Sequence, residues 1–180
     1  IEFLRSVEGR NYSGKKVIVV GGGNTAIDAA RSAKRTGADV TIIYRRTQSE
    51  MPAHETEVRA AGAEGVRIEY QCAPLKSLDN GKILCQKMCC GDLDKSGRSR
   101  PVPVEGSDFE MDFDILVEAI GQEINRSGFE KFIGKNGWID TDGSYRTSHN
   151  NIYAGGEAES GPLTVTAAIG AGRMAAMSID

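Results

Sequence analysis

The spacing of apolar positions divides the first third of the chain into alternating strands and helices. The run Val17–Val20 is wholly apolar and rich in β-branched residues, as in a parallel strand buried on both faces. Ile27, Ala30 and Ala33 then recur at helical spacing before Gly37. The pattern predicts, in order, a strand at 16–21, a helix at 24–36, a strand at 40–44, a helix at 55–63 and a strand at 66–72. This order favours an α/β fold, a Rossmann-like parallel sheet with helices on both faces.

The pattern changes in the second half of the chain. Between Leu75 and Ile115, short strand-like runs are broken by turn-forming clusters at 79–81, 94–97 and 106–107, which predicts hairpins or a β-meander. The sequence DILVEAIG at 114–121 returns to the pattern of a buried strand. The remaining expected elements are a short helix and linker at 1–14, a strand-like segment at 151–156 and a closing helix at 163–177.

A glycine-rich turn joins the first predicted strand to the first predicted helix. It matches the motif G-x-G-x-x-A with Gly21, Gly22, Gly23, Asn24, Thr25 and Ala26. Gly21 permits the tight turn, Gly23 lets the backbone approach a pyrophosphate, and Ala26 keeps the helix close to its strand. The free amides at the start of the helix attract phosphates. In this strand-turn-helix context, the motif predicts a dinucleotide-binding site.

A second match to the same motif, GAGRMA at 170–175, serves as a control. Only five residues follow it, so no second strand can complete a nucleotide-binding unit. We therefore predict a closely packed helix there.

The end of the second predicted strand indicates which dinucleotide binds. An acidic residue at this place would bind a ribose hydroxyl, but Tyr44 is followed by Arg45 and Arg46. A guanidinium binds a 2′-phosphate by donating paired, charge-assisted hydrogen bonds to its oxygens. The pair predicts NADP, with a solvated strand end as the alternative for either arginine alone.

Composition and charge exclude several other classes. With 180 residues, 39% hydrophobic and 26% charged, the chain suits one globular domain, or one domain plus part of another. The net charge of −3 and the interleaved basic and acidic residues argue against nucleic acid. No apolar run approaches the roughly 20 residues that a membrane-spanning helix needs. The chain opens at Ile1 without a signal peptide, and we expect a fragment of a cytoplasmic protein.

The four cysteines do not have the spacing of a metal or redox site. Cys85, Cys89 and Cys90 form C-x-x-x-C-C, and Cys72 stands apart. In a strand, Cys85 and Cys89 share one face and Cys90 takes the other. We expect three small hydrophobic residues in a reducing cytosol.

No side chain stands out as a catalytic acid or base. Tyr12 and Lys16 have the Y-x-x-x-K spacing of short-chain reductases, but they precede the glycine turn that such a pair follows. His54 and His149 are isolated and are interpreted as polar loop residues. No catalytic residue and no metal ligand is assigned.

Three segments together resemble one known family over nearly the whole chain. They are the stretch at 21–66 with GGGNTA, YRR and EMPA, the stretch DFDILVEAIGQ at 112–122, and the stretch at 147–176 with YAGGEAESGP. This combination resembles the glutamate synthase small-subunit family, which includes the flavin half of dihydropyrimidine dehydrogenase and, more distantly, adrenodoxin reductase.

The resemblance implies an NADPH-binding domain inserted into a discontinuous FAD-binding domain. Residues 1–14 would be a helical linker from the absent FAD half, residues 15–122 the Rossmann-like NADPH domain, and residues 123–180 the C-terminal segment of the FAD domain. It also implies hydride transfer from NADPH to FAD, with electrons passing to iron–sulfur centres in absent regions or to a larger partner subunit. We expect the chain alone to bind NADPH but not to hold FAD or turn over.

The resemblance also implies roles for individual residues. The pyrophosphate would lie on Gly21, Gly23, Asn24 and Thr25, and the 2′-phosphate on Arg45 and Arg46. Ala119, Ile120 and Gly121 would lie along the nucleotide. The flavin's ribityl-phosphate chain would meet Gly156 and Glu157, and Thr164 would start the helix that faces the isoalloxazine.

One residue departs from the family pattern. The family usually has Asp after the two glycines, whereas this chain has Glu157, whose extra methylene shifts the carboxylate. Either Glu157 still contacts FAD or it is a surface acid. The corresponding alternative function is a non-catalytic nucleotide-binding or subunit-docking module that has lost flavin binding.

Overall fold

The computed structural model describes the chain apart from residues 1, 8, 95–96, 122–124, 162–163 and 180. Contacts divide it into two compact units, Ile1–Gly121 and Gln122–Asp180. We call them the N-terminal and C-terminal units and describe each by itself.

A four-stranded parallel sheet forms the centre of the N-terminal unit. Its strand order is β3-β2-β1-β7, with β1 at Lys16–Val20, β2 at Asp39–Tyr44, β3 at Arg67–Tyr70 and β7 at Ile115–Glu118. Ile18 pairs with Thr41 on one side and with Leu116 on the other. The predicted strands are confirmed, including the late strand β7, and the structure adds that β7 lies beside β1.

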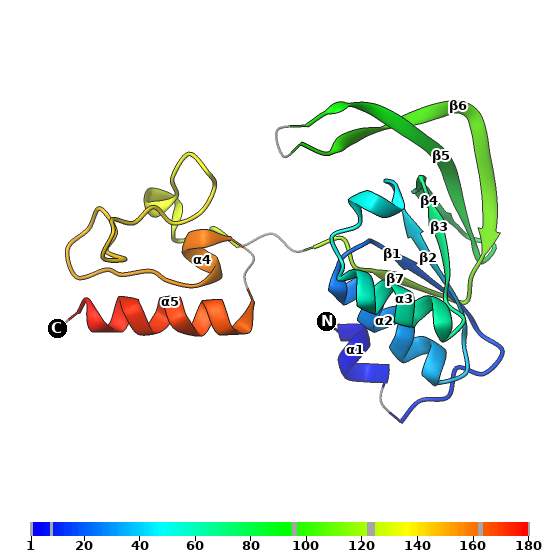
Figure 1. Ribbon diagram of the computed structural model, residues 1–180, viewed down its shortest axis with the longest axis horizontal. Coiled ribbons are helices and arrows are strands. Elements are labelled where there is room, and N and C mark those ends of the chain that lie inside the picture. Colours follow the sequence, from blue (N-terminus) through cyan, green and yellow to red (C-terminus); the bar gives the residue numbers. More distant parts are fainter. Residues whose placement is uncertain (1, 8, 95–96, 122–124, 162–163, 180) are drawn as a thin grey trace. The chain divides into compact units, whose positions relative to one another are not determined.

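Helices cover one face of this sheet (Figure 1). They are α1 at Glu2–Val7, α2 at Asn24–Arg35 and α3 at Glu55–Ala63. Val17 and Val19 of β1 pack against the buried alanines of α2 and against Val58 of α3. The apolar spacing predicted this contact, because it places the small residues of α2 on a single helical stripe.

Ion pairs hold α2 beside α3. Arg31 of α2 bonds to Glu57 and Glu64, and Arg35 bonds to the same Glu64 oxygen at 2.7 Å. The hydrogen bonds from Arg31 and Arg35 lower the pKa of Glu64 to about 2. Glu64 therefore stays ionised and continues to link the two helices well into the acidic range.

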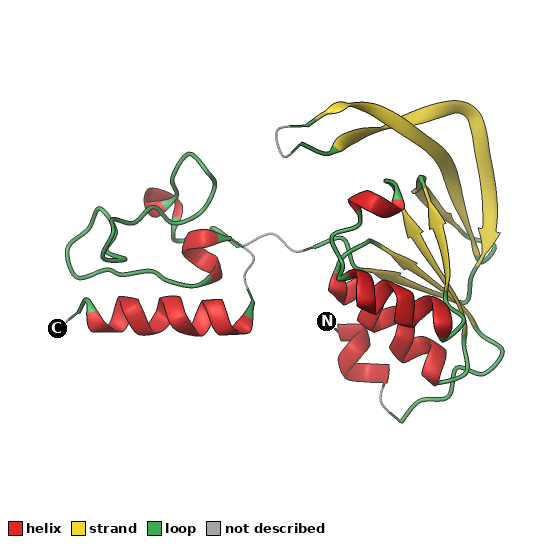
Figure 2. Cartoon of the chain, viewed as in Figure 1, coloured by secondary structure: helices red, strands yellow, loops and turns green. Residues whose placement is uncertain are grey.

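An antiparallel sheet, not helices, covers the opposite face (Figure 2). Its strands are β4 at Cys72–Leu78, β5 at Lys82–Leu93 and β6 at Ser99–Asp112, in the order β4-β5-β6. Ile18 and Ile43 pack against Ile83 of this meander. The α/β class and the meander are confirmed, but the expectation of helices on both faces is wrong. The apolar run of β1 requires a cover on each face without specifying which kind of element provides it.

The cysteines fall into two pairs. Cys72 and Cys85 are buried in the contact between the two sheets, whereas Cys89 and Cys90 are both exposed. A register shift between Gln86 and Met88 breaks the alternation of β5, and of the three cysteines expected to act as small hydrophobic residues only Cys85 is buried. The hydrogen bond with Cys85, together with burial, raises the pKa of the Cys72 thiol.

The C-terminal unit consists of short helices and loops around one longer helix. The helices are η2 at Glu130–Phe132, α4 at Glu157–Ser160 and α5 at Val165–Met177. The segment expected to be strand-like forms no strand, and its Tyr153 makes only an isolated bridge with Arg146. Asn151, the first residue of that segment, has φ of 68° and turns the chain there.

The second glycine motif lies inside α5, so the predicted helix there is confirmed. Its glycines are not at the close contact, since a Cβ on Gly170 or Gly172 would meet nothing within 4 Å. The close approach is made by Gly155, whose Cβ would come 3.0 Å from the carbonyl oxygen of Ala171. A glycine outside the motif thus permits the tight packing.

Gly21 provides a test of how closely β1 and β7 meet at the turn. It has φ of +137°, and a Cβ there would lie 2.3 Å from the Ala119 carbonyl oxygen. We expect Gly21→Ala to lower the free energy of unfolding by about 2 kcal/mol or more.

Gly23→Ala is the matched control. Gly23 has φ of −85°, and a Cβ there would meet nothing within 4 Å. We expect Gly23→Ala to lower the free energy of unfolding by about 1 kcal/mol or less. Urea unfolding of both variants measures the two losses. Equal losses would mean that the approach of Gly21 to Ala119 does not limit this turn.

Candidate functional site

The turn after β1 is tightly built at its first two glycines. The Gly21 amide donates to the Ile43 carbonyl at 3.1 Å. At Gly22, a Cβ would come 2.4 Å from the Tyr44 ring, so this ring lies directly on the backbone. The motif leaves the Gly22 position free, and only the packing of Tyr44 shows why glycine is needed there.

The third glycine opens the turn toward solvent. Gly23 is the N-cap of α2 in an extended conformation, with no side chain bonded to the helix end. Its carbonyl accepts hydrogen bonds from Ala26 and Ile27. The amides of Asn24 and Thr25 donate to no other described group, and both residues are exposed. This helix end presents open backbone donors of the kind that bind phosphates.

The Asn24 side chain points into the protein's own loop. Its Oδ1 accepts a hydrogen bond from the His54 amide at 2.9 Å, and the Ala53 amide donates to the Gly22 carbonyl. These bonds join the loop before α3 to the glycine turn. Asn24 can therefore offer a ligand its backbone amide while its side chain holds the turn in shape.

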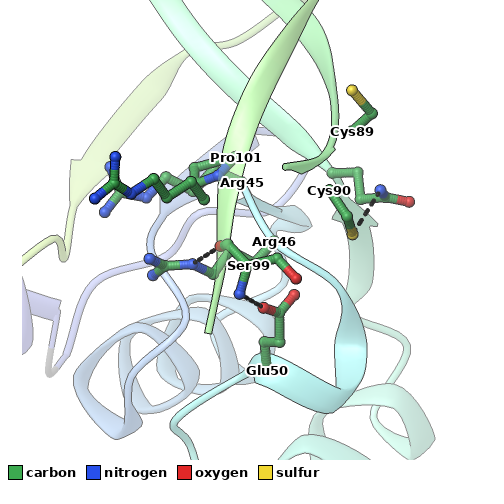
Figure 3. Close-up of a pocket in the computed structure, with 9 residues that line it drawn as sticks. Arg45, Arg46, Glu50, Cys89, Cys90, Ser99 and Pro101 are labelled. Atoms are coloured by element: carbon green, nitrogen blue, oxygen red, sulfur yellow. Dashed lines mark hydrogen bonds between the residues drawn. The ribbon is translucent and has the colours of Figure 1, made fainter. Parts of the chain in front are cut away.

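The two arginines after β2 have different surroundings. Arg46 is largely buried, with 10% of its side chain exposed, and forms an ion pair with Asp94 at 2.9 Å. Its Nε also donates to the Ser99 carbonyl at 2.9 Å, as Figure 3 shows. Arg45 is exposed and pairs with no carboxylate in the described part of the chain. The two arginines are adjacent in the sequence, but in the structure Arg46 is engaged by Asp94 and Ser99 while Arg45 is exposed to solvent.

A short helix, η1 at Gln48–Glu50, holds the start of β6 against the end of β2. Glu50 accepts a hydrogen bond from the Thr47 hydroxyl at 2.7 Å. It also accepts one from the Ser99 amide at 2.7 Å (Figure 3). These bonds, with the Thr47 hydroxyl contributing most, lower the pKa of Glu50. Sequence reasoning missed Glu50 because its partner Ser99 is distant in the chain.

These groups line a shallow depression at the end of β2. In Figure 3, Arg45 and Arg46 lie on one side of the segment carrying Ser99 and Pro101, while Cys89 and Cys90 lie on the other. The full lining is Arg45, Arg46, Glu50, Gln71, Cys89, Cys90, Ser99, Arg100 and Pro101. The meander therefore contributes more residues to this depression than the end of β2 and its loop do.

The end of β7 lies next to the glycine turn. The Ala119 amide donates to the Val20 carbonyl at 2.8 Å, and the following Ile120 is 72% exposed. Gly121 has φ of +100°. The carboxyl ends of β1, β2 and β7 thus share one edge of the sheet, which is where ligands bind in open α/β folds.

In the C-terminal unit, the three residues assigned to flavin lie at helix starts. Gly156 has φ of 75° and is the N-cap of α4, and Glu157 is that helix's first residue. Thr164 is the N-cap of α5, its hydroxyl accepting from the Ala167 amide at 3.2 Å. Because a Cβ on Gly156 would lie 3.7 Å from Ala168, this glycine packs on the first turns of α5.

No three histidine, cysteine or acidic side chains among the described residues gather as metal ligands would. No helix within the described ranges has both the length and the apolar character to cross a bilayer.

The family is established by comparison with known proteins. Residues 2–172 match the model described as pyridine nucleotide-disulphide oxidoreductase. The chain belongs to this family. Its α/β fold, with a parallel and an antiparallel sheet, is also the fold of solved thioredoxin reductases.

Several curated relatives support this membership. The chain is 45% identical to NADP(+)-dependent formate dehydrogenase subunit beta of Moorella thermoacetica, over 100% of its own length and 27% of the relative. It is 41% identical to NADPH-Fe(3+) oxidoreductase subunit beta of Geobacter sulfurreducens, over 100% of this chain and 32% of the relative. It is 35% identical to the glutamate synthase [NADPH] small chain of Escherichia coli, over 94% of this chain and 39% of the relative. The chain thus spans well under half of these relatives, and the resemblance seen in the sequence is confirmed.

Solved structures show the same fold at lower identity. Thioredoxin reductase of Lactococcus lactis matches with a TM-score of 0.73 and 22% identity, covering 93% of this chain and 52% of that one. FprA of Mycobacterium tuberculosis in complex with NADPH matches with a TM-score of 0.68 and 19% identity, covering 94% and 53%. Because the identity is this low, these two structures support the fold of the chain and nothing further.

The hydrogen bonds of Glu50 generate a pH-dependent prediction. The pKa of Glu50 is lower in the folded protein than its unfolded value of about 4.5. The ionised carboxylate therefore stabilises the fold fully above the unfolded pKa, and this stabilisation is lost as the pH falls through the folded pKa. We expect Glu50→Gln to be less stable than wild type at neutral pH, with the difference shrinking in acid.

Thermal unfolding across the pH range measures this difference. Glu55→Gln is the control, because the Glu55 side chain is 85% exposed and its ion pair with Arg59 is long, at 4.0 Å. A Glu50→Gln deficit that stays constant down to low pH would contradict the role assigned to the carboxylate.

Proposed function

We propose that this chain is the NADPH-binding part, together with a C-terminal FAD-binding segment, of a cytoplasmic oxidoreductase that passes electrons from NADPH through FAD to iron–sulfur centres or a partner subunit. The observation that carries the proposal is the exposed Arg45 at the end of β2, on the same sheet edge as the open start of α2. An acidic residue at that place would repel a 2′-phosphate, and a guanidinium attracts one.

The glycine turn fits a dinucleotide pyrophosphate. The space around Gly23 is open, and the amides of Asn24 and Thr25 are available as donors. In this proposal Gly21 and Gly22 shape the turn and Ala26 keeps α2 close to β1. The adenosine 2′-phosphate lies at Arg45, and Ala119, Ile120 and Gly121 lie along the nucleotide.

The C-terminal unit fits a segment that needs more protein around it. Helix α5 buries only Ala175 among its own residues, while Val165, Ile169 and Met174 are exposed at 77%, 67% and 51%. A large exposed apolar surface of this kind usually marks a binding face. We assign it to the rest of the FAD domain, because the relatives are much longer than this chain.

The chemistry would come from the bound cofactors, NADPH supplying a hydride and FAD accepting it. The chain's own residues bind and orient them. Gly156 and Glu157 would meet the ribityl-phosphate chain, and the start of α5 at Thr164 would face the isoalloxazine. Glu157 keeps the carboxylate that Asp usually provides, one methylene farther from the backbone.

The relatives' names support NADP(H) and a partner subunit. All three relatives name NADP(H), two are called subunit beta and one a small chain. The four free cysteines agree with a reducing compartment.

Cofactor titration tests the nicotinamide assignment. Arg45→Ala should weaken NADPH binding by about tenfold or more and change NADH binding less than about twofold, because only NADPH carries the 2′-phosphate. Isothermal titration of the purified protein measures both affinities. Arg59→Ala, which removes another exposed arginine from α3, should change neither. Equal losses for the two cofactors in Arg45→Ala would refute the 2′-phosphate role.

A spectroscopic test separates the oxidoreductase from the docking module. In the full-length protein, we expect bound flavin whose absorbance bleaches when NADPH is added without oxygen. A full-length protein that binds NADPH but contains no flavin would favour the module.

A further inference from the structure

A third arginine, distant in the sequence, lines the same depression as Arg45. We propose that Arg100 of β6, and not Arg46, supplies the second guanidinium that binds the adenosine 2′-phosphate. This inference rests on the proposed function and makes the β-meander part of the cofactor specificity site.

Arg46 already has partners of its own. Its guanidinium bonds to the Asp94 carboxylate and to the Ser99 carbonyl, both at 2.9 Å, and only 10% of the side chain is exposed. To turn toward a phosphate, it would have to give up its bonds to a half-buried carboxylate and to a backbone carbonyl. That loss would offset much of the gain from the new bond.

The contacts that occupy Arg46 also position Arg100. Ser99 is bonded through its carbonyl to Arg46 and through its amide to Glu50, so the residue before Arg100 is held on both sides at the end of β2. Gly91 of β5 lets the neighbouring strand pass close, since a Cβ there would come 3.1 Å from the Arg100 carbonyl oxygen. The backbone of Arg100 is therefore held from both the β2 side and the β5 side.

The charges of the depression leave two guanidinium groups available. Glu50 is committed to Thr47 and Ser99, and Asp94 is paired with Arg46. Within the described residues, neither Arg45 nor Arg100 has a carboxylate partner, and both are exposed. A phosphate monoester carries up to two negative charges, and two arginines can meet it with paired hydrogen bonds.

The two arginines reach the depression by independent routes. Arg45 directly follows β2, whereas Arg100 comes from the meander that covers the other face of the sheet. A 2′-phosphate bound between them would rest on both sheets. NADH, which has no such phosphate, would gain nothing from Arg100.

Affinity measurements on matched variants test this assignment. We expect Arg100→Ala to weaken NADPH binding about tenfold and NADH binding less than about twofold, with Arg100→Lys intermediate because it keeps the charge but loses the fork. Lys76→Ala removes an exposed cation from β4 of the same antiparallel sheet and should leave both affinities unchanged.

Arg46→Ala completes the comparison. We expect it to speed hydrogen exchange of the Ser99 amide and to reduce the NADPH preference less than Arg100→Ala does. If Arg100→Ala keeps the full NADPH preference, or if Arg46→Ala loses more of it with Ser99 exchange unchanged, the assignment is wrong. A wild-type protein that binds NADPH and NADH equally would instead refute the proposed function, which distinguishes the two failures.

Discussion

The structure of the N-terminal unit depends on the burial of β1 from both sides. Val17 and Val19 face the helices, while Ile18 and Val20 face the antiparallel sheet. A strand buried in this way must end in a turn that other elements can approach closely. At that turn the Ala119 carbonyl lies against Gly21, and the Tyr44 ring lies against Gly22. The ligand-binding edge is thus shaped by the same packing that stabilises the core.

The second constraint is the attachment of β6 to the end of β2. Ser99 accepts from Arg46 and donates to Glu50, while Asp94 neutralises Arg46. Each polar group in this partly buried contact has a partner, as buried polar groups require. The attachment brings the meander to the place where a Rossmann-like fold recognises the adenosine ribose. The proposed specificity site is therefore shared between two sheets.

Sequence reasoning succeeded where local periodicity carries the information. The strands and helices of the first half, the return of β7 and the position of α5 follow from apolar spacing and from turn residues. It was wrong where a distant segment decides the outcome. The exposure of Cys89 depends on a register shift opposite β6, and the cover of the second sheet face depends on how the meander folds back.

The sequence by itself determined the family, the glycine turn and the adjacency of Arg45 to Arg46, because these are matters of residue type and local spacing. Only the tertiary structure distinguished the two arginines. Their neighbours along the chain are nearly the same, yet Arg46 meets Asp94 and Ser99 while Arg45 faces solvent. The energy of a charge depends on the partners and the solvent around it, and those are set by chain segments that come together only on folding.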